Sequence, residues 1–167
     1  MATVTQLTRA LADQPFLSDL PPDILRQLAA HVRRRDYVAG EVLFREGETA
    51  DRFFLIHRGL VMLTMRAPNG NSVDIDTLGP DAAVGWSWLL SPYRYHLTAT
   101  ALKKTSTLVF DAFRLRAVME GEPATGYELM HRFANIIFDR LRAVHARIGA
   151  DQGDGADKSR PGRNLSS

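Results

Sequence analysis

The residues best suited to chemistry lie between positions 85 and 96. Gly85 stands two positions before the start of a short helix that we expect over residues 87–90. A glycine lets the backbone approach a bound group, and the free amides at a helix N-terminus attract an anion. Arg94 follows closely and could neutralise a phosphate. This segment therefore predicts a site for a small anionic ligand. The predicted ligand-binding residues are Gly85, Trp86, Ser87, Trp88, Arg94, Tyr95 and His96.

Other kinds of chemistry find little support in the chain. It has no cysteine, which excludes disulfides, thiolate metal sites, iron–sulfur clusters and cysteine nucleophiles. The segment around Ser87 lacks the second glycine of the G-x-S-x-G motif that holds the nucleophile of many hydrolases, so we expect no hydrolase chemistry. The histidines lie far apart in different expected elements and lack metal-ligand spacing: His31, His57, His96, His131 and His145. We therefore expect no catalytic residues, no metal site, no bound cofactor and no enzymatic activity.

The elements that position the candidate site alternate in period along the chain. Helical spacing is expected over residues 3–13, and a second helix starts at Pro22 and continues through Val32, with Arg33 to Arg35 at its C-terminal end. The pattern then changes to short apolar or alternating runs separated by glycine and proline, which is typical of a sandwich or barrel. The expected strands are residues 36–38, 42–44, 53–57, 60–66, 72–78, 83–84, 97–101 and 107–110.

A long helix is expected from Pro123 to about Ile148. Its apolar residues step alternately by four and three, which is the spacing of a coiled-coil seam: Met130, Ala134, Ile137, Leu141, Val144 and Ile148. This pattern indicates a homodimer formed through the C-terminal helix. The alternative is that Phe133, Ile136 and their neighbours pack on the sheet, because fewer than three heptads are present.

Composition and segment lengths bound the remaining possibilities. We divide the chain into an N-terminal helical segment (1–15), a β-roll (16–120), a C-terminal helix (121–148) and a disordered tail (149–167).

A net charge of +2 does not point to nucleic acid, and no helix–turn–helix pattern follows the long helix, so we expect no direct DNA binding. The N-terminus lacks the apolar region of a signal peptide, and no stretch is long enough to span a membrane. A cytoplasmic location is expected.

The sequence from Leu43 to Gly59 resembles that of the cyclic nucleotide-binding domain family. Within this family, it is similar to the regulatory domains of the catabolite activator protein and Fnr-like branch. The resemblance continues through Thr77-Leu78-Gly79-Pro80 and Val84-Gly85 to Thr107-Leu108-Val109-Phe110. It implies a mainly β fold, an eight-stranded jelly-roll with N-terminal helices and a long C-terminal helix. It also implies a phosphate-binding cassette at residues 84–101 and a cyclic nucleotide, cyclic AMP or cyclic GMP, as ligand.

Two positions depart from the cassette that the resemblance implies. The family has a glutamate directly after the glycine, which holds the ribose hydroxyl, and an arginine ten residues after the glycine. Here these positions are Trp86 and Tyr95, and Arg94 is one residue away from the arginine position. We interpret Trp86 as functional, closing the pocket or stacking on a flat ligand, and Trp88 as core packing. The chain is thus predicted to be a variant with a Gly-Trp-Ser-Trp-Leu cassette and without a DNA-binding domain.

Two functions remain open from the sequence. In the first, the chain is a stand-alone regulatory sensor of a cyclic nucleotide or another small anionic ligand. The cassette binds the anionic end of the ligand, Arg132 or Arg140 of the last helix caps the other end, and the helix shifts and changes assembly with a protein partner. In the second, the chain is a ligand-independent protein-interaction or dimerisation module that has lost cyclic nucleotide binding. Control of transcription would require a DNA-reading partner chain.

Overall fold

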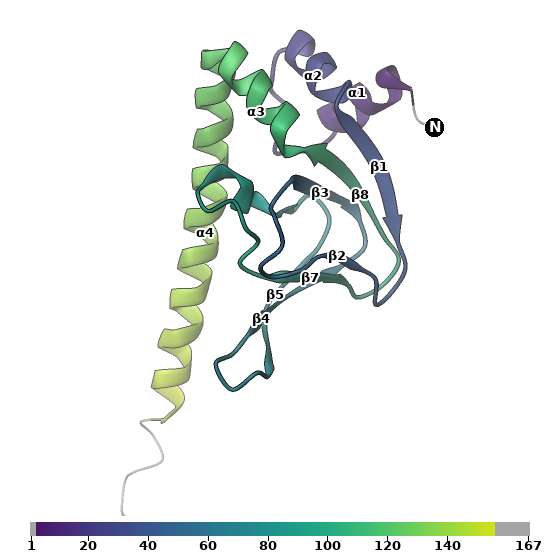
Figure 1. Cartoon of the computed structure of the whole chain (residues 1–167). Coiled ribbons are helices and arrows are strands. Elements are labelled where there is room, and N and C mark those ends of the chain that lie inside the picture. The colour runs from purple at the N-terminus through teal and green to yellow at the C-terminus, as the bar shows by residue number, and fades with distance from the viewer. Residues whose placement is uncertain (1–2, 156–167) are drawn as a thin grey trace, which may run out of the picture. The chain divides into compact units, whose positions relative to one another are not determined.

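The computed structural model describes residues 3–155 and the side chains of residues 3–146. Contacts divide the chain into two compact units, Met1–Met130 and His131–Ser167. The first unit contains the N-terminal helices, all the strands and the candidate site (Figure 1). The second unit contains the greater part of the last helix. None of the described helices combines the length and apolar content needed to cross a membrane.

Two short helices open the chain. Helix α1 (Val4–Ala12) begins with a capping box, in which the Thr3 hydroxyl accepts from the Gln6 amide and the Gln6 side chain accepts from the Thr3 amide. Helix α2 (Pro22–Ala29) has its proline in the first turn and buries Ile24, Leu25, Leu28 and Ala29. Both helices were expected from their apolar spacing.

The prediction for the end of the second helix was wrong. Helix α2 stops at Ala29, and Val32 to Tyr37 form strand β1, so the arginine triplet lies on a strand. Strand β1 pairs with β8 (Thr105–Asp111) over six residues, from Val32 opposite Phe110 to Tyr37 opposite Thr105. This long-range pairing overrides the local helical periodicity, which continued by coincidence through Val32.

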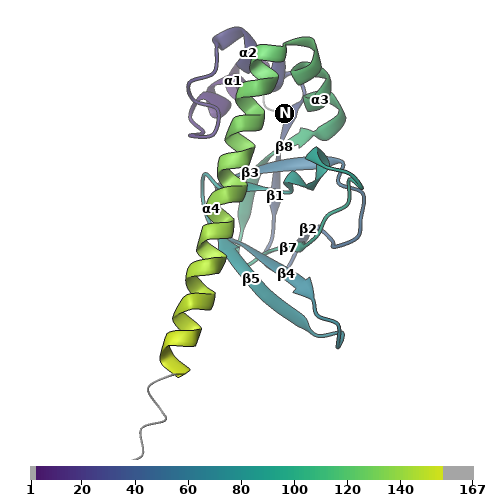
Figure 2. The same cartoon turned by 90° about the vertical axis from the view of Figure 1, so that its left-hand side faces the viewer.

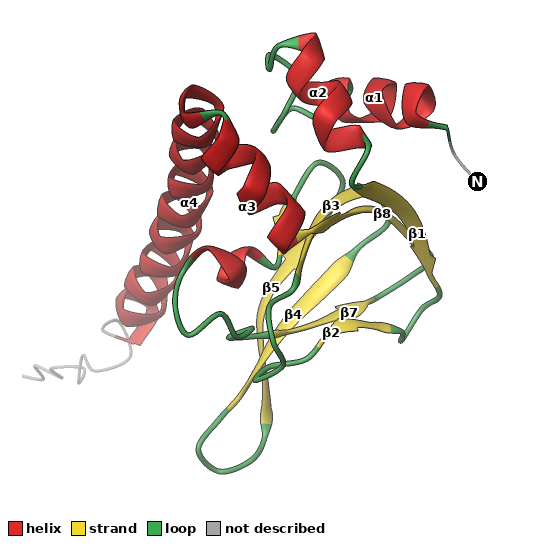
Figure 3. Cartoon of the chain, turned by 45° about the horizontal axis from the view of Figure 1, so that its top comes forward, coloured by secondary structure: helices red, strands yellow, loops and turns green. Residues whose placement is uncertain are grey.

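Within residues 3–155, eight strands form two antiparallel four-stranded sheets, which confirms the predicted jelly-roll (Figure 3). The strand order is β1-β8-β3-β6 in one sheet and β2-β7-β4-β5 in the other. The remaining strand bounds are β2 Val42–Phe44, β3 Arg52–Arg58, β4 Val61–Arg66, β5 Ser72–Leu78, β6 Ala83–Val84 and β7 Thr98–Ala101. The expected strands fall on these elements, with β1, β3 and β8 longer than expected.

The core centres on β3 and β8. Residues 53–56 of β3 are all almost completely buried, which requires cover on both faces of the strand. The Phe53 ring lies 5.4 Å from that of Phe110 on β8 and 5.8 Å from that of Phe16, in the segment between the first two helices. That segment thus completes the core beneath β3.

Two helices follow the sheets. Helix α3 (Ala112–Gly121) is capped by Asp111, whose carboxylate accepts from the Arg114 amide at 2.9 Å. Helix α4 (Pro123–Gly155) begins tightly against it: a Cβ added to Gly126 would lie 2.5 Å from the Met119 carbonyl oxygen. Figure 2 shows α4 as one uninterrupted helix. It continues to Gly155, past the expected end at Ile148, and the rest of the predicted tail lies outside the described residues.

Candidate functional site

The candidate cassette occupies the connection between β6 and β7. It opens with Gly85, whose φ of 82° is in the left-handed region that favours glycine. A Cβ at this position would lie 3.2 Å from the rings of both Phe44 and Phe54. The backbone therefore needs glycine for its conformation and for close packing. The helix that follows is a 3₁₀ helix over Trp86–Leu89, so it begins one residue earlier than expected.

The two tryptophans of this helix differ in burial. Trp88 is 1% exposed, which fits the interpretation that it packs in the core, whereas Trp86 and the neighbouring Ser87 are half-buried. The Arg116 guanidinium, from α3, donates to the Trp88 carbonyl oxygen at 2.6 Å. The same guanidinium lies 4.7 Å from the centre of the Tyr93 ring. One arginine of α3 thus holds the end of the 3₁₀ helix and the loop that follows it.

Tyr95 lies inside the jelly-roll. It is 3% exposed, and its ring stacks on Phe44 with a centroid separation of 4.0 Å. Its hydroxyl donates to the Arg52 carbonyl oxygen at 2.8 Å and accepts from the Arg52 amide at 3.1 Å. Burial raises the pKa of the phenol, so the group is neutral at physiological pH. Tyr95 therefore fastens the cassette to the start of β3, with both hydrogen bonds of its hydroxyl directed to protein backbone.

Arg94 points away from that interior. Its guanidinium donates to the Gly47 carbonyl oxygen at 2.8 Å, and its side chain is exposed. Backbone hydrogen bonds join the same two segments, because Gly47 donates to the Tyr95 carbonyl oxygen and Ala50 to that of Tyr93. His96 is also exposed. Successive residues of an extended segment face opposite sides, so Arg94 and Tyr95 cannot both face a ligand inside the barrel.

The arrangement brings only part of the predicted set together. Gly85, Trp88 and Tyr95 belong to the packed interior, Trp86 and Ser87 lie at its margin, and Arg94 and His96 lie on the surface. Sequence reasoning missed the partners that fix this geometry, which are Phe44, Arg52 and Arg116. Phe44 could have been found from its place in the apolar strand 42–44, but the contacts of the two arginines depend on tertiary pairing. No group of three or more acidic or histidine side chains suited to a metal occurs in the described part of the chain.

Comparison with known proteins agrees with this architecture. The family model described as "Cyclic nucleotide-binding domain" matches residues 34–122. Glutaminase 1 of Bradyrhizobium diazoefficiens is 31% identical over 146 residues, which are 84% of this chain and 22% of that protein. The CRP-like cAMP-activated global transcriptional regulator of Mycobacterium tuberculosis is 25% identical over 138 residues, 83% of this chain and 60% of the regulator. This chain thus spans less than two thirds of either curated relative.

A solved structure extends the likeness in fold. The cyclic nucleotide-binding domain of Methylobacillus flagellatus KT superposes with a TM-score of 0.74 at 18% identity, covering 97% of this chain and 86% of that one. The likeness spans the helices as well as the two sheets, and the family model covers strands β2 to β8 completely. The chain belongs to the cyclic nucleotide-binding domain family.

Proposed function

We propose that this chain is a regulatory domain that senses a small ligand through a non-standard cassette. The observation that carries the proposal is the glycine-led 3₁₀ helix between β6 and β7, on which Trp86 and Ser87 remain half-buried and accessible to a ligand. Ser87 offers a hydroxyl, and the amides of this short helix offer donors to an anion. The glutamate and arginine of the family's cassette are absent, so the ligand is held without them.

The relatives support a regulatory role with varied outputs. One is named as a glutaminase and the other as a cAMP-activated transcriptional regulator, and each contains further sequence beyond the matched part. A domain of this family therefore accompanies different activities in different proteins. For this chain we propose a non-enzymatic, cytoplasmic role, with a protein partner that reads the ligand state and without direct contact to DNA.

In this proposal, ligand binding would act on the protein partner through a homodimer formed by α4. Large apolar side chains are exposed along this helix: Met130 is 42%, Leu141 50% and Val144 37% exposed. With Ala134 and Ile137 they follow the four-and-three spacing of a dimer seam. A ligand that favours one position of this helix would shift the population of dimer states only by its difference in affinity for them.

The second candidate function is an interaction module that no longer binds a nucleotide. Its support is the state of Tyr95, which fills the position of the family's arginine and directs its hydroxyl to the Arg52 backbone. Arg94, the nearest cation along the chain, is engaged with the Gly47 carbonyl. In this function the domain would dimerise and bind its partner constitutively.

Fluorescence titration of the full chain with cyclic AMP and cyclic GMP distinguishes the ligand sensor from the interaction module. Trp86 is the half-buried reporter, and the Trp86→Phe variant identifies its part of the signal. Losing one charge-assisted hydrogen bond to phosphate costs about 1.5–3 kcal/mol, so we expect saturable binding some 10- to 150-fold weaker than a cassette with the arginine would give. A flat response up to about 1 mM, with a folded dimer in sedimentation, would favour the module instead.

A further inference from the structure

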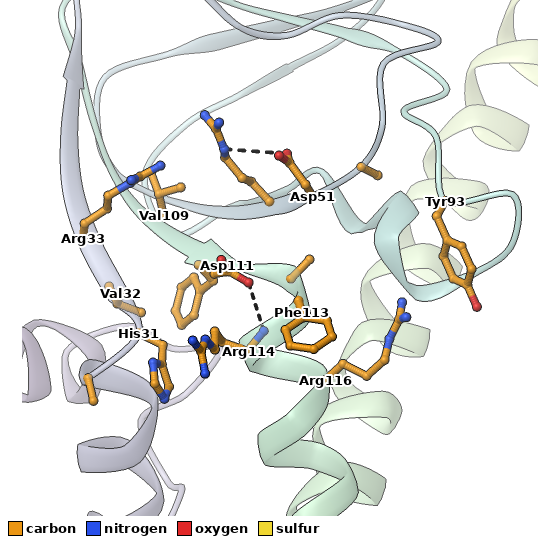
Figure 4. A pocket seen from close by; sticks show the side chains of 15 residues that line it. His31, Val32, Arg33, Asp51, Tyr93, Val109, Asp111, Phe113, Arg114 and Arg116 are labelled. Atoms are coloured by element: carbon orange, nitrogen blue, oxygen red, sulfur yellow. Dashed lines mark hydrogen bonds and ion pairs between the residues drawn. The ribbon is translucent and has the colours of Figure 1, made fainter.

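A cationic pocket lies in the first compact unit and is lined mainly by residues outside the cassette. It has a volume of about 670 Å³ and is lined by four arginines, which are Arg33, Arg52, Arg114 and Arg116. We call it the arginine pocket. His31, Tyr93 and Phe113 also line it, together with two carboxylates, Asp51 and Asp111. Figure 4 shows these side chains arranged around a common space, with Arg33 and Arg116 on opposite sides of it.

Strand pairing creates this pocket. Arg33 lies opposite Val109 in the β1–β8 ladder, two residues before the Asp111 cap of α3. The first turns of α3 then bring Phe113, Arg114 and Arg116 to the same region (Figure 4). Because the arginine triplet lies on a strand and not at the expected helix end, Arg33 lines the same pocket as the arginines of α3.

The carboxylates of the pocket are already engaged. Asp51 lies 3.6 Å from the Arg52 guanidinium, and Asp111 accepts from the Arg114 backbone amide. Arg116 is held by the Trp88 carbonyl and the Tyr93 ring. Among the side chains that the structure describes, those of residues 3–146, no hydrogen bond or ion pair joins the guanidinium of Arg33 or Arg114 to another group. Four arginines against two aspartates leave the lining with an excess of two positive charges when His31 is neutral.

Aromatic surface accompanies these two arginines. Phe113 is 75% exposed, and Tyr93, whose ring is covered on one face by the Arg116 guanidinium, is 42% exposed. Phe113 is adjacent to Arg114 in the chain, and Figure 4 shows its ring at the edge of the pocket between Arg114 and Arg116. Planar guanidinium groups bind phosphate through two parallel hydrogen bonds, and an exposed ring offers a face to a flat group. The volume falls within the range of small-molecule sites, about 300–1,000 Å³.

We propose that the arginine pocket is a second ligand site, which takes a phosphate-bearing small molecule with an aromatic body, the class to which nucleotides belong. Arg33 and Arg114 bind the phosphate groups, and Phe113 stacks on the ring. The lining favours a ligand with two negative charges, because such a ligand neutralises the excess of two positive charges that the four arginines hold over the two aspartates. Tyr93 is the residue that the pocket lining and the cassette segment 84–101 have in common, and none of the predicted ligand-binding residues lines the pocket. The proposal therefore stands independently of the proposed sensor function.

Amide chemical shifts of the ¹⁵N-labelled full chain, titrated with ADP, test this site directly. We expect saturable shifts at residues 31–33 and 111–116. Pyrophosphate, which lacks the ring, and adenosine, which lacks the phosphates, should each bind at least about tenfold more weakly than ADP.

The variant Arg33→Ala/Arg114→Ala should weaken ADP binding by at least about tenfold, and the matched variant Arg9→Ala/Arg26→Ala, with the same loss of charge on α1 and α2, should leave it unchanged. Shifts confined to residues 85–96 would overturn the proposal, as would equal loss in both double variants. Tighter binding of an aspartate-rich peptide than of ADP would assign the pocket to a protein partner and would also overturn it. Cyclic AMP titrated in the same way tests binding at the cassette. The two titrations therefore distinguish an absence of binding at the cassette from an absence of binding at the arginine pocket.

Discussion

Replacing Tyr95 tests whether this residue holds the fold or is available to a ligand. Tyr95→Phe keeps the ring on Phe44 and removes the hydroxyl that bridges the amide and carbonyl of Arg52. Each hydrogen bond contributes about 0.5–1.5 kcal/mol net, and the two backbone groups would be left at a half-buried position. We therefore expect a loss of about 1–3 kcal/mol in the free energy of unfolding. Tyr95→Ala also removes a buried ring and should lose about 3–5 kcal/mol or more.

Urea unfolding at 25 °C, followed by circular dichroism, measures both losses. Tyr93→Phe is the matched control, because Tyr93 is partly exposed and no hydrogen bond of its hydroxyl occurs among the described residues. We expect its unfolding free energy to stay within about 0.5 kcal/mol of that of the unchanged chain. If Tyr95→Phe also stayed within that range, the hydroxyl would have no structural task, and the argument that the cassette position is given over to packing would be refuted.

Further predictions concern backbone, pH and assembly. Gly59→Ala should destabilise the chain more than Gly47→Ala in urea unfolding. Both glycines have a positive φ, but a Cβ at position 59 would lie within 3 Å of backbone atoms where the β7–β8 turn meets β8, whereas the space around position 47 is open. Burial, together with two nearby arginines, lowers the pKa of His57 below its ordinary value near 6.5. The unfolded chain therefore binds the proton more tightly than the folded chain, and the free energy of unfolding should fall as the pH drops below about 6.5. His57→Gln should flatten that pH dependence of the unfolding free energy. Leu141→Glu should shift sedimentation from dimer to monomer, and Leu102→Glu, with similar exposure on a loop, should not.

The sequence predicted the architecture well because two local signals were strong. Glycine and proline punctuation separated short apolar runs, and strands β2, β5 and β6 have the bounds expected from those runs. The four-and-three spacing of the last helix was equally clear, and its continuation to Gly155 exceeded the prediction. The error at Arg33 to Arg35 has a different origin: a pairing with residues more than seventy positions later decides that segment, and no local window contains that information.

The candidate site was harder to predict, because its chemistry depends on side-chain direction. Both Arg94 and Tyr95 were expected at the ligand, and only the register of the segment against residues 47–50 determines which of them faces inward. That register buries Tyr95 and turns Arg94 to the surface. The role of Arg116 was equally hidden, because its partner is a main-chain carbonyl, which no sequence pattern marks.

The distribution of arginines has a consequence for how this domain distinguishes anions. In the cassette, the group closest to the family's arginine position is a neutral phenol that is committed to the backbone, so the attraction for phosphate rests on the amides of a four-residue helix. Such amides give modest, local stabilisation, whereas guanidinium groups give charge-assisted hydrogen bonds roughly twice as strong. The uncommitted guanidinium groups of Arg33 and Arg114 line a pocket formed by residues of β1, β8 and α3. If both proposed sites bind ligands, we expect a singly charged ligand with an apolar body to prefer the site at Trp86 and a multiply charged one to prefer the arginine pocket.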